Sequence, residues 1–338
     1  MLLIEWNQYS DEYQKQQNEI YTAAITEPSL ITNEQVTAPI NPGINDGIPS
    51  VNQEINPFSV LLDDSDTFNF STNALDLVVS ADGGDVISAS LPKFPIRLDT
   101  PNQPFRLLEN NNLRRYVAQS GLIGPDGIDA SGNRARYESQ GVTNNGDGSH
   151  TLTLAWTGSD PLGMQVYKRF TAHDDRYDVD VSFDIRNGGS SVASVTSFAQ
   201  LKRDNTRAPD GNKGFGVSPY LGAALTQPEE RYTKLSFSDL KDKPFSKQLP
   251  AGWVAILQHY FVSAWIPSQQ ASHDYFASQL SNGDNVIGYK NQSVDIAPGS
   301  KATIQQTLYV GPKDQVALAA LAENLDLVID YGWLWWLA

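Results

Sequence analysis

The sequence predicts a mainly β fold, an antiparallel sandwich followed by a short helix near the C-terminus. Apolar and polar residues alternate in several stretches, as they do in strands with one buried and one solvated face. Clusters of Gly, Asn and Asp separate these stretches, and few helical patterns lie between them. Strands that follow one another without intervening helices disfavour parallel βαβ units and favour an antiparallel sandwich.

The strand signals are spread along most of the chain. The clearest runs from Tyr177 to Ile185, where apolar side chains alternate with Asp178, Asp180, Ser182 and Asp184. A turn sequence, Asn187-Gly188-Gly189, ends this strand. In chain order, we expect strands at residues 73–80, 151–157, 177–185, 192–201, 252–266, 286–290 and 303–310.

One convincing helix is expected, at residues 314–324, after the Gly311-Pro312 pair that marks its start. Apolar side chains recur there at helical spacing and predict one stripe that packs on the sandwich. The residues of this stripe are Val316, Leu318, Leu321 and Leu325.

Residues 10–66 are expected to form an acidic, polar linker without stable structure, because prolines interrupt them and few apolar residues recur. The whole chain carries a net charge of −15, and no Lys or Arg lies between Gln16 and Pro92. A nucleic-acid partner is therefore not expected, because phosphate binding depends on clustered basic residues.

The sequence predicts no catalytic, metal-binding or cofactor-binding residues. The chain has no cysteine, and its four histidines show no metal-ligand spacing. His259 lies in an apolar run and is interpreted as a core or edge residue. The adjacent acids, such as Asp174-Asp175, point to opposite faces if they lie on a strand, so adjacency does not make them a catalytic pair.

Both ends of the chain are apolar. Residues 1–6 and 331–338 are short hydrophobic stretches, and the second contains Trp333, Trp335 and Trp336. They could pack locally, or they could adjoin membrane helices, since aromatic rings favour the boundary between lipid and water.

Several stretches resemble the periplasmic domain of the YidC-type membrane protein insertases of Gram-negative bacteria. They occur in one consistent order from about residue 73 to the C-terminus, and the segment Asp330-Tyr331-Gly332-Trp333 is the most specific. The strongest are residues 252–267 (GWVAILQHYFVSAWIP) and 325–335 (LDLVIDYGWLW). Weaker ones are residues 83–86 (GGDV), 104–108 (PFRLL), 119–122 (QSGL) and 308–312 (LYVGP).

The resemblance implies a β-supersandwich of the galactose-mutarotase type, without catalysis, in the periplasmic part of a multi-pass inner-membrane protein. It implies the end of one membrane helix at residues 1–9, the linker at 10–66, the sandwich at 67–311, a helical segment at 312–330 and the start of a second membrane helix at 331–338. The implied partners are the Sec translocon (SecYEG), SecDF and nascent inner-membrane proteins. The residues expected at the boundary with the membrane are Val316, Leu318, Leu321, Leu325, Tyr331, Gly332, Trp333 and Trp335.

Two alternatives remain open at this point. A carbohydrate-binding or mutarotase-like sandwich could stack sugars on Trp156, Trp253 or Trp265, although their places on apolar faces favour a core position. A periplasmic binding or scaffold protein would need no membrane part at all.

Overall fold

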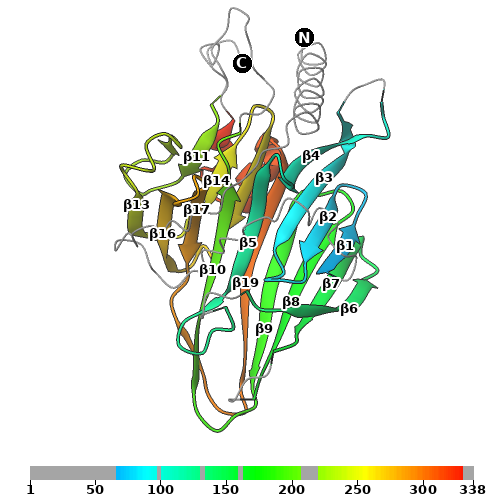
Figure 1. Ribbon diagram of the computed structural model, residues 1–338, viewed down its shortest axis with the longest axis vertical. Coiled ribbons are helices and arrows are strands. Elements are labelled where there is room, and N and C mark those ends of the chain that lie inside the picture. The colour runs from blue at the N-terminus through cyan, green and yellow to red at the C-terminus, as the bar shows by residue number, and fades with distance from the viewer. Residues whose placement is uncertain (1–65, 97–99, 130–133, 159–162, 207–219, 330–338) are drawn as a thin grey trace, which may run out of the picture.

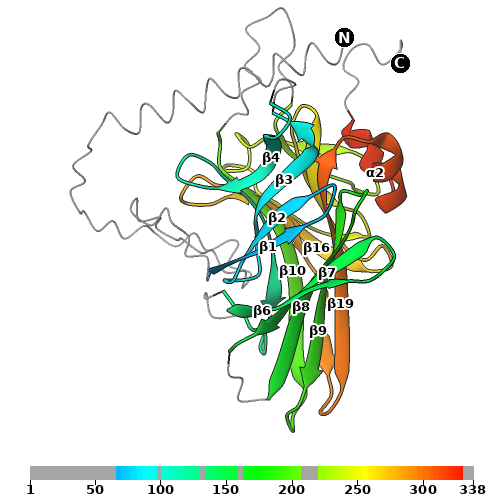
Figure 2. The ribbon, with the colours of Figure 1, turned by 90° about the vertical axis from the view of Figure 1, so that its right-hand side faces the viewer.

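The computed structural model describes residues 66–96, 100–129, 134–158, 163–206 and 220–329. Within them, two antiparallel sheets pack face to face, and a short helical segment lies against the nine-stranded sheet (Figures 1 and 2). The prediction of a mainly β sandwich with a helical segment near the C-terminus is confirmed.

The ten-stranded sheet contains the first strands of the fold and most of its middle part. Its strands follow the order β1-β2-β3-β4-β5-β10-β17-β16-β13, and β18 pairs with β10. The strands are β1 (Thr67–Ser71), β2 (Asp76–Ser80), β3 (Val86–Pro95), β4 (Pro104–Asn110), β5 (Arg115–Ile123), β10 (Ala193–Arg203), β13 (Phe245–Pro250), β16 (Ser272–Gln279), β17 (Asn285–Lys290) and β18 (Val294–Ile296).

The nine-stranded sheet has the order β12-β11-β14-β15-β19-β9-β8-β7-β6. Its strands are β6 (Tyr137–Asn144), β7 (Ser149–Trp156), β8 (Met164–His173), β9 (Asp178–Asn187), β11 (Gly222–Leu225), β12 (Thr233–Leu235), β14 (Val254–Leu257), β15 (Phe261–Ile266) and β19 (Lys301–Pro312).

Each strand predicted from alternation is present, but the strand expected at residues 252–266 is two strands. β14 and β15 form a hairpin, and the backbone N–H of Gln258 donates to the carbonyl of Phe261 over 3.0 Å. The stretch reads as one apolar run because both strands are buried on both faces. His259 lies in the hairpin turn and is exposed, so of the two expected positions, core or edge, the core is wrong for this residue.

The main hydrophobic core lies between the two sheets and takes side chains from both of them. Trp265 of β15 is 1% exposed, and its indole N–H donates to the backbone carbonyl of Gln200 on β10 over 3.1 Å. Trp253 is fully buried, whereas Trp156 is only partly buried. The interpretation of Trp253 and Trp265 as core residues is therefore confirmed.

No helix in the described ranges is both long enough and apolar enough to cross a membrane. The stretches expected at residues 1–9 and 331–338, and the linker up to residue 65, lie outside the described residues.

Candidate functional site

The C-terminal helical segment consists of α2 (Gln315–Leu321) and the single 3-10 turn η2 (Leu325–Val328). Asp314 caps α2, because its carboxylate accepts a hydrogen bond from the backbone N–H of Ala317 over 2.9 Å. Between α2 and η2, the backbone of Asn324 is left-handed, with a φ of 63°. The helix therefore ends earlier than predicted, at Leu321 instead of Asn324.

This segment docks on the face of β14 and β15 that points away from the other sheet. Alternation explains the division: Val254 and Ile256 belong to the core between the sheets, whereas Trp253 and Ala255 point outward. The indole N–H of Trp253 also donates to the backbone carbonyl of Glu323 over 3.1 Å. The docked layer contains Trp253, Ala255, Leu257, Val262, Ala264, Ile266, Leu318, Ala322, Leu325 and Val328.

The predicted apolar stripe is only partly right. Leu318 and Leu325 are fully buried in this layer, and Leu321 packs partly buried against it. Val316 is 81% exposed, so the prediction that it packs on the sandwich is wrong. Residues two apart on an α-helix point about 200° apart, so Val316 and Leu318 cannot share a face.

Four other residues were expected at the boundary with the membrane. Tyr331, Gly332, Trp333 and Trp335 lie outside the described residues. Their proposed place at a membrane surface stays a prediction.

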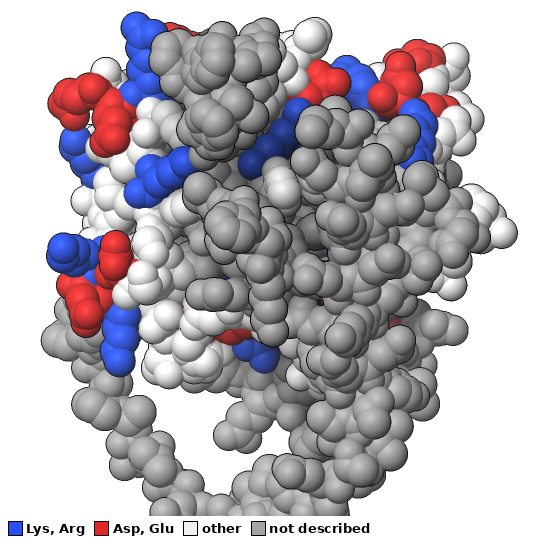
Figure 3. Space-filling view, turned by 90° about the horizontal axis from the view of Figure 1, so that it is seen from above, with Lys and Arg blue, Asp and Glu red and all other residues white. Residues whose placement is uncertain are grey.

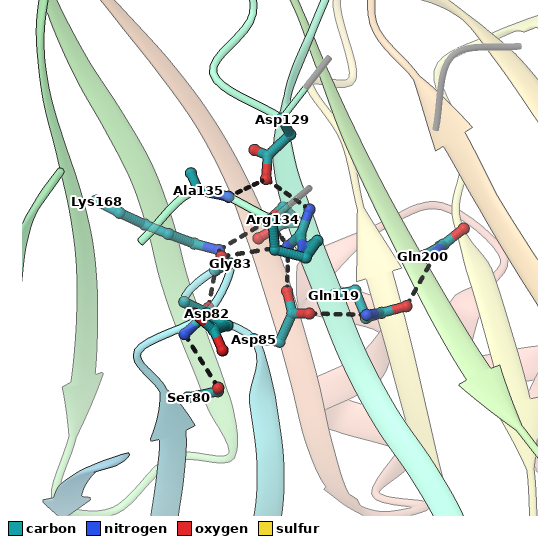
Figure 4. Close-up of polar contacts among 12 residues, drawn as sticks. Ser80, Asp82, Gly83, Asp85, Gln119, Asp129, Arg134, Ala135, Lys168 and Gln200 are labelled. Carbon is teal, nitrogen blue, oxygen red and sulfur yellow. Dashed lines mark hydrogen bonds and ion pairs between the residues drawn. The ribbon is translucent and has the colours of Figure 1, made fainter. Parts of the chain in front are cut away.

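A second feature, which the sequence did not predict, is a buried cluster of charges between the sheets (Figure 4). Lys168 of β8 lies on the strand's inner face, between Val166 and Phe170, and is fully buried. Its ammonium donates hydrogen bonds of 2.8–2.9 Å to the backbone carbonyls of Ser120 on β5 of the other sheet and of Gly83 and Gly84 in the β2–β3 turn. Lys168 therefore ties the two sheets together.

Arg134 completes this cluster. Its guanidinium pairs with the carboxylates of Asp85 and Asp129, and it shares the carbonyls of Gly83 and Ser120 with Lys168. Its side chain is 6% exposed. Burial alone would lower the pKa of the guanidinium, but the carboxylates of Asp85 and Asp129 outweigh burial and hold this pKa above its ordinary value. A hydrogen-bonded chain continues from Asp85 to Gln119 and on to Gln200.

Two glycines leave the space that this cluster occupies. A Cβ on Gly83 would lie 2.3 Å from Nε of Arg134, and Gly83 has a φ of 76°. A Cβ on Gly121 would lie 2.4 Å from the carboxylate of Asp129. The stretches GGDV and QSGL, which are far apart in the sequence, thus meet at one place. In the sequence, the only indication of this buried cluster is that Lys168 stands between Val166 and Phe170, at a position where the alternation of β8 would place an apolar side chain.

Among the described residues, no group of three or more His, Cys, Asp or Glu side chains is placed to bind a metal ion. His259 is exposed, and its ring stacks on that of Tyr260 with centroids 4.1 Å apart. His150 lies 3.4 Å from Asp174 in a surface contact, and buried His273 contacts the backbone carbonyl of Ser268 over 2.8 Å.

Charges on the end of the molecule near α2 are mixed. Figure 3 shows that end from above, and on its described surface the basic and acidic side chains are interspersed.

Comparisons with known proteins agree on one family. The family described as the YidC periplasmic domain matches residues 67–338. A membrane protein insertase YidC from Marinomonas is 38% identical over all of this chain and 60% of that protein. One from Pseudomonas fluorescens is 41% identical over 81% of this chain and 50% of that protein. The chain thus spans about half to 60% of the length of these relatives.

Solved structures of low sequence identity are also similar. A galactose mutarotase related enzyme from Lactobacillus acidophilus is 12% identical, with a TM-score of 0.49 over 72% of this chain and 97% of that one.

Proposed function

Because this chain belongs to the YidC family of membrane protein insertases, we propose that it is a non-catalytic domain that supports the insertion and folding of inner-membrane proteins. It is the periplasmic part of an inner-membrane protein. The structural observation that carries the proposal is the docking of the C-terminal segment on β14 and β15.

The docked segment can fix the orientation of the sandwich relative to the membrane. Leu318, Leu325 and Val328 are fully buried, so the last described residues cannot swing freely from the sheet. The sequence that follows contains Tyr331 and Trp333, and we propose that these residues lie at the outer surface of the membrane, where a membrane helix begins. The domain would then act by steric positioning and not by chemistry.

The test is complementation of a strain depleted of its own insertase by the full-length protein that contains this chain. Insertion of a membrane-protein substrate should be restored by the native protein. A full-length protein that accumulates in the membrane but restores neither insertion nor growth would contradict the proposal.

Contacts with the Sec translocon (SecYEG) and SecDF form a second part of the proposal, supported by the family alone. The chain has no cysteine, so a single cysteine placed on the exposed surface gives one defined crosslinking position. Crosslinks to SecYEG or SecDF from at least one face would support these partners. Surface positions around the whole domain that yield none would exclude them.

Replacing His259 by Gln should leave insertion unchanged. The side chain is exposed in the β14–β15 turn and its ring stacks on that of Tyr260, so we expect its replacement by another polar side chain to leave the buried core unchanged. Complementation by the full-length variant at equal expression is the measurement. A loss of activity would point to a role for the β14–β15 turn.

The alternative function, a carbohydrate-binding or mutarotase-like sandwich, can be tested with the native chain and with His259→Gln. The native chain should show neither binding of free sugars nor acceleration of anomer exchange. A mutarotase activity that His259→Gln abolishes would overturn the assignment as a non-enzyme.

A further inference from the structure

The ten-stranded sheet has an outer face, which points away from the core between the sheets. On β16, Tyr275 and Ala277 point into that core, so Phe276 between them points outward. The same alternation applies to the neighbouring strands β5, β10 and β17, which Figure 1 shows side by side with β16. Their outward side chains include Val117, Phe198 and Val286.

These outward side chains are apolar and buried. Phe276 is only 5% exposed and Phe198 only 1%, and both valines are buried as well. None of the three apolar clusters formed by the described residues contains any of the four. An antiparallel sheet face that is left to water carries polar side chains, so a buried apolar row indicates a face that is covered.

Two glycines form a shallow floor on this face. Phe276 lies over Gly288 of β17, where an added Cβ would come within 2.7 Å of the ring. Phe198 lies over Gly121 of β5 in the same way, at 2.8 Å. One side of each ring thus rests against the sheet, and the other side is available to an apolar layer above it.

The chain enters the fold at the edge of this sheet. Asp66 is the first described residue, and its carbonyl accepts a hydrogen bond from the backbone N–H of Ala81 in the β2–β3 turn over 2.8 Å. The nearest apolar run that precedes it is at residues 58–62 (FSVLL). If this run is extended, Phe58, Val60 and Leu62 share one face.

The length of this segment matches the width of the face. At Val86 and Ala118, β3 pairs directly with β5, so β17 lies five strand spacings from β1. Neighbouring strands are about 4.8 Å apart, which makes this distance roughly 24 Å. The eight residues from Phe58 to Asp66 span up to about 28 Å when extended. The run can therefore cross β5 and β10 and reach β17.

We propose that the outer face of the ten-stranded sheet is a docking surface for residues 58–62 of the same chain. Phe58, Val60 and Leu62 cover the apolar row of this face and close it to other partners. The linker expected at residues 10–66 is then free only up to residue 57.

The first test measures access to the outer face by thiol labelling of the whole chain, which has no other cysteine. Ser278→Cys reports on the face, because Ser278 lies two residues from Phe276 on β16 and is buried. Ala277→Cys is the matched control, since the next residue along the strand points into the core. Replacing Phe58, Val60 and Leu62 together by Asn should speed labelling of Ser278→Cys about tenfold or more, because their apolar contacts are lost.

Labelling of Ala277→Cys should stay slow in both backgrounds. Replacing Ile44, Ile48 and Val51 by Asn, farther back in the same segment, should leave the rate at Ser278→Cys unchanged. The proposal is overturned by fast labelling of Ser278→Cys in the otherwise native chain, by a rate that the change at residues 58–62 does not alter, or by an equal effect of both triple changes. A rate that falls as the protein concentration rises would assign the face to a second copy and would also overturn it.

The second test needs no disruption of the apolar run. A nitroxide on Ser59→Cys should broaden the NMR signals of the methyl groups of Val117 and Val286. The methyl groups of Val316, on α2 beyond the other sheet, should stay sharp. Sharp signals from Val117 and Val286 would overturn the proposal, and this result decides alone if the triple change at residues 58–62 also speeds labelling of Ala277→Cys.

Discussion

Arg134→Met is expected to destabilise the sandwich by about 3–5 kcal/mol, because it leaves two buried carboxylates without their cation. Asp129 is fully buried and Asp85 is 5% exposed, so water cannot replace the guanidinium without opening the fold. The carbonyls of Gly83 and Ser120 would each lose one donor as well. The measurement is the free energy of unfolding from urea titration at neutral pH.

The chain offers a matched control two residues away. Arg136 also pairs with two carboxylates, those of Asp66 and Asp82, but its side chain is 46% exposed. Arg136→Met should therefore cost no more than about 1 kcal/mol. Adding Asp85→Asn to Arg134→Met should recover part of the loss, because the two residues are in contact and their effects are not additive. Equal losses from Arg134→Met and Arg136→Met would show that burial of the cluster does not matter.

Leu318→Asp should release the C-terminal segment while the sandwich stays folded. Leu318 is fully buried, and removal of a buried leucine side chain alone costs about 2–5 kcal/mol. A carboxylate in the same apolar layer costs more, and a helix of seven residues has little stability of its own. A loss of about 3 kcal/mol lowers the docked population roughly a hundredfold relative to the undocked one.

Amide hydrogen exchange at residues 314–328 measures this release. Exchange should quicken there in Leu318→Asp and stay slow in β14, β15 and β19. Val316→Asp is the matched control, since it places the same charge on the exposed face of the same helix. If Leu318→Asp leaves the exchange of the segment unchanged, the docked layer does not depend on this residue.

Local patterns predicted the strands well. The alternation from Tyr177 to Ile185 identifies β9 because each side chain there meets either the core or water. The same reasoning failed at residues 252–266, where both faces are buried: one by the core and the other by the C-terminal segment. Periodicity carries no information on a turn between two such strands.

The buried cluster could not be predicted from spacing. Asp85, the β5–β6 connection with Asp129 and Arg134, and Lys168 of β8 are separate parts of the chain, and only the tertiary fold brings them together. The resemblance nevertheless marked GGDV and QSGL as characteristic stretches. Their glycines leave room for Arg134 and Asp129, which is a tertiary requirement.

Val316 shows the limit of counting apolar positions on a short helix. Its spacing of five from Leu321 and two from Leu318 does not place it on one face with either residue. Leu318 and Leu325 satisfy the helical spacing and are buried, although a turn at Asn324 separates them.

Membrane insertion by the full-length protein, with Leu318→Asp and Val316→Asp compared at equal expression, tests the central claim most directly. The docked C-terminal segment is proposed to fix the sandwich relative to the membrane part. Leu318→Asp should therefore impair insertion of a membrane-protein substrate, whereas Val316→Asp should insert it as well as the native protein does. Normal insertion by Leu318→Asp, with the segment shown by hydrogen exchange to be released, would contradict the claim.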